Sequence, residues 1–147
     1  MGLENAVSYE HVLVDFELPS QIFHITPVDL GGYAAASGDS NPIHLDREAA
    51  QAVGLPDVIA HGMLTMGLAG RVVTDWCGNP GAIEEYSARF VKPVVVCSDS
   101  PTEIHVTGKI QQKLPENRVL IDLSVKCQDI KVLAMARVVV KLKASHG

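Results

Sequence analysis

The chain has 147 residues, a net charge of −5 and a hydrophobic content of 47%. This length predicts a single domain over residues 1–147, because two shorter pieces would each bury too small a core. The acidic net charge argues against a nucleic-acid partner. No apolar run reaches the ~18 residues of a membrane span, and the first residues lack the pattern of a secretory signal. Together these features predict a cytoplasmic protein.

The N-terminal part is predicted to lead into one strand and one helix. Residues 1–19 show no regular pattern and are expected to be irregular, and a strand is predicted over Gln21–Thr26. Thr26 is a suitable helix cap, and Pro27 fits the first helical position. A helix is therefore expected to run from Pro27 to about Ala36.

A loop and a short helix are predicted next. Gly38 suits the residue that ends a helix, and the residue before Pro42 is pushed out of the helical region. Asp46 can cap a short helix that runs through Ala52, and Gly54 can end it. The loop between the two helices is therefore held at both ends.

The segment from Gly62 to about Trp76 is predicted to be the longest helix. It is apolar nearly all round, which indicates burial on most sides. Gly67, Ala69 and Gly70 would let another group approach its axis closely.

From Ile83 onward, apolar residues recur at every second position, which is typical of strands with one buried face. The order of one strand, then helices, then a run of strands predicts an α+β domain whose antiparallel sheet packs against the long helix. The apolar sets are Tyr86, Ala88 and Phe90; Ile104, Val106, Gly108 and Ile110; Val119, Ile121, Leu123 and Val125; and Val132, Ala134, Ala136, Val138, Val140 and Leu142.

Cys77, Cys97 and Cys127 are widely spaced and form no CxxC pair. This spacing predicts neither a disulfide framework nor a metal site. We interpret the three residues as buried thiols of a reducing compartment.

The loop from Ser37 to Asp46 contains the strongest functional signal. Asp39 and His44 lie five residues apart beside Gly38 and Pro42, and both a carboxylate and an imidazole can exchange protons near neutral pH. A structural alternative is a capping loop in which Asp39 binds backbone N–H groups and His44 is partly buried. The loop alone allows both interpretations.

A wider pattern resembles one known family. The loop motif, together with later blocks, is similar to the signature of the MaoC-like (R)-specific enoyl-thioester hydratases and dehydratases, a hot dog fold family. Within that family it is most similar to the catalytic subunit of heterodimeric (3R)-hydroxyacyl-carrier-protein dehydratases. The blocks are Tyr33, Ser37–His44, Ala60–Gly67, Val73–Trp76, Pro80–Ala82, Glu85–Tyr86, Arg89–Phe90 and Lys92–Val94.

The resemblance implies a role for several residues. Asp39 and His44 would be catalytic, with His44 at C2 of the substrate and Asp39 at its hydroxyl. The backbone N–H of Gly62 would stabilise negative charge on the thioester oxygen, and Asn41 would orient the loop or bind water, with a purely structural role about equally open. His61 is interpreted as a capping or core histidine. Some hydratases of the family carry a hydroxyl residue where this chain has Gly70.

The resemblance implies a single hot dog domain that needs no cofactor or metal. Its expected substrate is an acyl thioester carried by acyl carrier protein or CoA, and its expected partner is a second copy or a related hot dog subunit. Dehydration of (3R)-3-hydroxyacyl carrier protein in fatty-acid elongation is the first hypothesis. Hydration of enoyl-CoA, for degradation or polymer synthesis, is the second, and a noncatalytic acyl-binding subunit is the third. Four cations could form a basic patch for an acidic carrier: Arg47, Arg71, Arg89 and Lys92.

Overall fold

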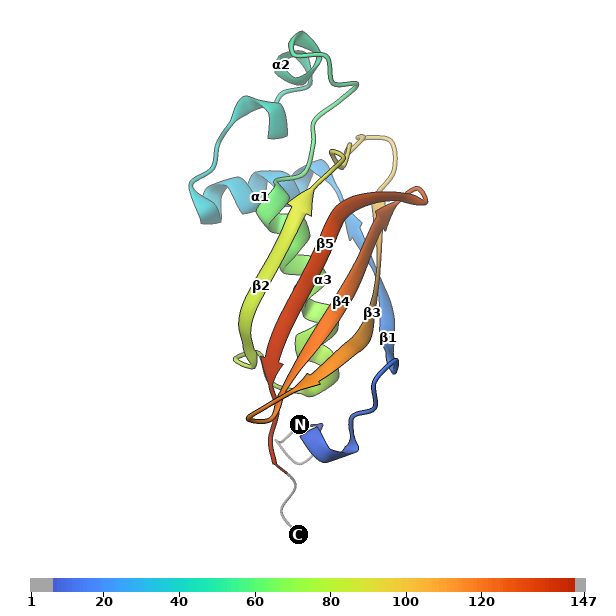
Figure 1. Ribbon diagram of the computed structural model, residues 1–147. Helices are drawn as coiled ribbons and strands as arrows, with labels where there is room; N and C mark the ends of the chain where they lie inside the picture. The colour runs from blue at the N-terminus through green and yellow to red at the C-terminus, as the bar shows by residue number, and fades with distance from the viewer. Residues whose placement is uncertain (1–6, 145–147) are drawn as a thin grey trace.

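The computed structural model describes residues 7–144, so residues 1–6 of the predicted irregular segment lie outside the described residues. Five antiparallel strands form one sheet in the order β1-β3-β4-β5-β2 (Figure 1). The strands are β1 (Glu17–Ile25), β2 (Ile83–Phe90), β3 (Thr102–Leu114), β4 (Arg118–Cys127) and β5 (Ile130–Lys141). Within residues 7–144, no helix combines the length and the apolar character needed to cross a membrane.

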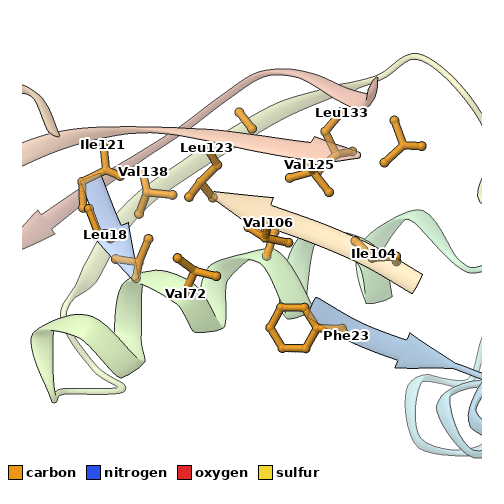
Figure 2. Close-up of a cluster of buried hydrophobic side chains, with 14 of the residues drawn as sticks. Leu18, Phe23, Val72, Ile104, Val106, Ile121, Leu123, Val125, Leu133 and Val138 are labelled. Atoms are coloured by element: carbon orange, nitrogen blue, oxygen red, sulfur yellow. The ribbon is translucent and has the colours of Figure 1, made fainter. Parts of the chain in front are cut away.

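The long helix α3 (Gly62–Cys77) packs on one face of the curved sheet, which confirms the predicted α+β architecture (Figure 1). Val72 of α3 faces Leu18, Val106 and Val138 of the sheet (Figure 2). All four of these side chains are buried, so the main core lies between the helix and the sheet. Burying this apolar surface is the main favourable contribution to folding.

The predicted alternation is confirmed in β3 and β4, where every residue of the two apolar sets is buried. It is wrong in the middle of β5. There Leu133 is buried and Ala134 is only half-buried, whereas Ala136 is buried as predicted; Met135, between Ala134 and Ala136, has a φ of 51°. Leu133 pairs with Val125 of β4, and the register shifts before the next pair, so a β-bulge turns the side chains.

β1 begins at Glu17, so the expectation of an irregular segment up to residue 19 is wrong at its end. Leu18 is already buried, and a short 3-10 helix covers Tyr9–His11. Pro19 lies at the register shift between Leu18 and Gln21, on a strand at the sheet edge. An edge strand tolerates proline because the missing N–H is not needed by a second neighbour.

Two short helices lie at one end of the sheet, near the start of α3 (Figure 1). In α1 (Pro27–Ser37), the N–H of Thr26 donates to the carboxylate of Asp29 at 2.8 Å, and Gly38 ends the helix with a φ of 80°. In α2 (Arg47–Ala52), Asp46 accepts a hydrogen bond from the N–H of Glu48 at 3.0 Å. Both predicted capping residues are confirmed.

The cysteines differ in exposure. Cys77 is buried and Cys127 half-buried, but Cys97 is exposed, so the prediction of three buried thiols is wrong for Cys97. Desolvation by burial raises the pKa of the Cys77 thiol and that of Cys127. Since the thiolate is the reactive form, burial protects both residues.

We therefore expect one fast-reacting thiol in the native protein. At mildly alkaline pH, Ellman's reagent should modify Cys97 well before the other two cysteines, because it alone is exposed. The fast phase should disappear in Cys97→Ser and persist in Cys127→Ser. Equal rates for all three thiols in the folded protein would contradict this assignment.

Candidate active site

Two segments that are distant in the chain meet at the start of α3. The N–H of Ile59 donates to the carbonyl of Ile43 at 3.1 Å, and His44 Nδ1 donates to the carbonyl of Ile59 at 2.7 Å. On its other side Ile59 forms a β-bridge with Val95. The backbone of Ile59 therefore holds the loop of residues 37–46 against the rest of the domain.

His44 has a defined tautomer. Because a carbonyl oxygen only accepts, His44 Nδ1 must carry the proton in its bond to Ile59. In the neutral ring, Nε2 then has the lone pair that can accept a proton. The side chain of His44 is nearly buried, with 8% of its surface exposed. It lines a cavity of about 330 Å³.

Asp39 and Asn41 shape the exposed part of the loop. Asp39 Oδ1 accepts from the N–H of Asn41 at 3.3 Å, and the Asp39 N–H donates to Ser37 Oγ at 3.2 Å. Asn41 Oδ1 accepts from the N–H of Ile43 at 3.2 Å, which starts the 3-10 turn at Pro42–His44. The structure thus places Asn41 as a loop-capping residue, and its contact with substrate or water stays a prediction.

His61 lies inside the same cluster. Its ring stacks on that of His44, with a centroid distance of 3.8 Å and an interplanar angle of 23°. His61 Nε2 donates to the carbonyl of Asp39 at 3.0 Å. The interpretation of His61 as a core residue agrees with its 2% exposure, but its side chain does not cap α3. The sequence pattern does not predict the contacts of His61 with Asp39 and His44. The sequence feature that points to them is the position of His61 directly before Gly62.

Gly62 is the first residue of α3, where a helix leaves N–H groups without a partner from the helix itself. It lines the 330 Å³ cavity together with His44, Thr65 and Phe90. A Cβ at this position would lie 2.8 Å from Cε1 of Phe90. Phe90 is 53% exposed although the β2 pattern predicts it on the buried face, because it covers Gly62 rather than the core.

The position of Gly70 explains the departure from the hydroxyl-bearing hydratases. A Cβ there would lie 3.3 Å from the ring of Tyr86, so the tyrosine occupies the space beside the helix. The Tyr86 hydroxyl donates to the carbonyl of Met66 at 2.7 Å. Burial raises the pKa of Tyr86 to about 12, so this donor stays protonated in alkaline solution as well as at neutral pH.

The polar side-chain atoms of the cluster are close enough for one water molecule or one substrate hydroxyl to bridge them. Among residues 7–144, Asp39, His44 and His61 each offer a nitrogen or oxygen atom within 4.8 Å of the other two. This donor set could hold a metal ion, but stacked rings direct their in-plane lone pairs side by side rather than toward one point. The arrangement is better suited to moving a proton beside the Gly62 N–H.

Comparison with known proteins identifies the family of the chain. Residues 15–126 match the MaoC like domain family. A 3-hydroxyacyl-thioester dehydratase X of Mycobacterium tuberculosis is 44% identical over 78 residues, covering 53% of this chain and 27% of that protein. A mitochondrial 3-hydroxyacyl-[acyl-carrier-protein] dehydratase of Solanum lycopersicum is 32% identical, covering 67% of this chain and 58% of the relative.

Two further comparisons are relevant. An (R)-specific enoyl-CoA hydratase of Rhodospirillum rubrum is 33% identical, covering 60% of this chain and 62% of the relative. The chain therefore spans less than two thirds of these three curated relatives. The structure superimposes on a MaoC-like dehydratase with a TM-score of 0.90 at 37% identity, over 95% of this chain and 43% of that one. The chain belongs to the MaoC-like domain family and has its hot dog fold.

Proposed function

We propose that this chain catalyses the reversible loss of water from (3R)-3-hydroxyacyl thioesters to give trans-2-enoyl thioesters. The observation that carries the proposal is the cluster at the start of α3. His44 offers a proton-accepting Nε2, the Asp39 carboxylate lies in the same cluster, and His44 shares its cavity with Gly62. These are the groups that such a reaction requires.

Each group has a step in the proposed mechanism. In dehydration, His44 Nε2 receives the proton that leaves C2, and the C3–OH bond breaks. The departing hydroxyl takes up a proton from the Asp39–His44 pair and leaves as water, so the pair returns the proton gained from C2 and ends as it began. The enolate-like charge on the thioester oxygen is stabilised by the Gly62 N–H, a contribution of about 3 kcal/mol for one such donor.

For the carrier, we propose acyl carrier protein and a role in fatty-acid elongation. Lys92 lines the 330 Å³ cavity and also a neighbouring cavity of about 830 Å³, so a cation is available along the path of a phosphate-bearing arm. Both carriers have this arm, so the choice between them rests on position 70, where the chain has Gly instead of the hydroxyl residue of some hydratases of the family. Enoyl-CoA hydration is the alternative, since relatives are named for each carrier.

The test uses matched trans-2-enoyl thioesters on acyl carrier protein and on CoA. Hydration is followed by loss of the enoyl absorbance, and kcat/KM is compared at the same acyl length. We expect hydration of both and a preference for the carrier protein. A strong preference for CoA would overturn the carrier assignment, and failure with both would overturn the chemistry.

We also propose that the active form contains a second hot dog subunit, either a copy of this chain or a related one. Several large apolar side chains are exposed, and a second subunit packed on them would remove them from water. They include Met63, Phe90, Val91, Ile130 and Met135. Mass determination in solution should give a dimer. A chain that stays monomeric and inactive until a related subunit is added would favour the heterodimer.

Gly62→Ala is expected to lower kcat/KM about tenfold, which corresponds to about 1.4 kcal/mol. The new Cβ would lie 2.8 Å from the Phe90 ring, which must move and reshape the cavity wall beside the thioester. Gly67→Ala is the matched control, because a Cβ there meets nothing within 4 Å. Phe90→Ala should restore part of the activity of Gly62→Ala. Full activity of Gly62→Ala alone would contradict this account.

A further inference from the structure

We infer that His61 is a positioning residue that holds Asp39 in its catalytic geometry, an inference that rests on the proposed function. His61 is 2% exposed and is not among the residues that line the 330 Å³ cavity. It therefore acts through its neighbours rather than on the substrate. Both candidate catalytic side chains of the loop, Asp39 and His44, have a polar atom within 4.8 Å of a ring nitrogen of His61.

The hydrogen bond from His61 Nε2 to the Asp39 carbonyl is the central contact. Its length is 3.0 Å, and because the carbonyl only accepts, Nε2 carries the proton. The other hydrogen bonds of Asp39 stay within the loop, to Ser37 and Asn41. The His61 bond is thus the one that ties the backbone of Asp39 to the buried part of the domain.

The ring of His61 contacts two other rings. The ring of Tyr33 of α1 is tilted by 57° against it at a centroid distance of 4.7 Å, and the ring of His44 stacks on it at 3.8 Å. The His61 carbonyl accepts from the N–H of Thr65 at 3.2 Å, within the first turn of α3. One residue therefore connects α1, the loop and the helix start that carries Gly62.

The buried Nδ1 of His61 shows that packing alone does not require an imidazole. Among residues 7–144 this atom has no hydrogen-bond partner, and a buried unpaired polar atom lowers stability. A phenyl ring could fill almost the same space between Tyr33 and His44 without that cost. What it could not supply is the N–H donor to Asp39, so we assign the function of His61 to that donor.

Three substitutions separate the donor from the ring. His61→Phe keeps a ring and loses the donor. His61→Gln loses the ring, but its amide nitrogen lies the same number of bonds from Cα as His Nε2 and can still donate to Asp39. His61→Asn has the same amide one bond shorter, which cannot reach, so it is the matched control for His61→Gln.

We expect kcat for enoyl-thioester hydration to fall about 10- to 100-fold in His61→Phe and His61→Asn, the range that misplacing a reacting group produces, with KM within about threefold of wild type. His61→Gln should recover most of kcat. Wild-type kcat in His61→Phe, or equal losses in all three variants, would overturn the inference, because a purely structural role does not distinguish Gln from Asn.

Amide hydrogen exchange tests the same inference without activity. Backbone amides at Asp39 and Asn41 should exchange faster in His61→Phe and His61→Asn than in wild type and His61→Gln. Unchanged exchange in all variants would also overturn the inference. A wild-type protein that is inactive on thioesters, yet shows this pattern of exchange, would overturn the proposed function and leave the positioning role intact.

Discussion

His44→Asn and Asp39→Asn are each expected to lower kcat for hydration of an enoyl thioester by about 10²- to 10⁴-fold, the usual contribution of a general acid or base. Asn at position 44 can still donate to the Ile59 carbonyl but offers no basic nitrogen. Asn at position 39 can still accept from the N–H of Asn41 but carries no carboxylate. Both variants should therefore fold normally, as checked by circular dichroism and thermal melting.

Two matched controls carry the same chemical changes at exposed positions. His11→Asn and Asp15→Asn alter residues outside the cluster and should retain wild-type kcat. Substantial activity in the Asp39→Asn/His44→Asn double variant would contradict the catalytic assignment. That result would favour the remaining alternative, a noncatalytic acyl-binding subunit whose apparent activity comes from elsewhere.

Ile121→Ala is expected to lower the free energy of unfolding by about 2–5 kcal/mol, the range for truncating a fully buried branched side chain. Ile121 lies on β4, the middle strand, and is completely buried. It pairs with Ile110 on one side and with Val138 on the other, so the cavity left behind has little freedom to collapse. Urea denaturation followed by circular dichroism measures the change.

Ile22→Ala is the control for this prediction. Ile22 lies on the edge strand β1 and is 52% exposed, so the same truncation should cost less than about 1 kcal/mol. Similar losses for the two variants would mean that the core does not lie between α3 and the sheet. The folded fraction of Ile121→Ala should keep its kcat, because Ile121 does not line the catalytic cavity.

The sequence predicts structural features that depend on residues close together in the chain. Asp29 lies three residues from Thr26, and Gly38 directly follows α1, so both ends of that helix are local events. The bulge of β5 at Met135 was not predictable, because it depends on how β5 pairs with β4. The early start of β1 was missed for a related reason. Pro19 argues against a strand unless that strand is known to lie at the edge.

The candidate site likewise has one part that the sequence predicts and one part that it does not. Asp39 and His44 share a short loop, so the chain itself brings them together. The contact between His61 and Asp39 forms because α3 begins beside the loop. Phe90 packs over Gly62 because β2 ends at the start of α3. These contacts follow from the packing of whole elements, which residue patterns do not specify.

The connection through Ile59 has a consequence for how the protein opens. Residues 58–60 bond to Ile43 and His44 on one side and to Val94 and Val96 on the other, outside the five-stranded sheet. A small cooperative unit of this kind can unfold locally at a lower free energy than the sheet requires. On heating, turnover should therefore be lost at a lower temperature than the one at which the sheet unfolds.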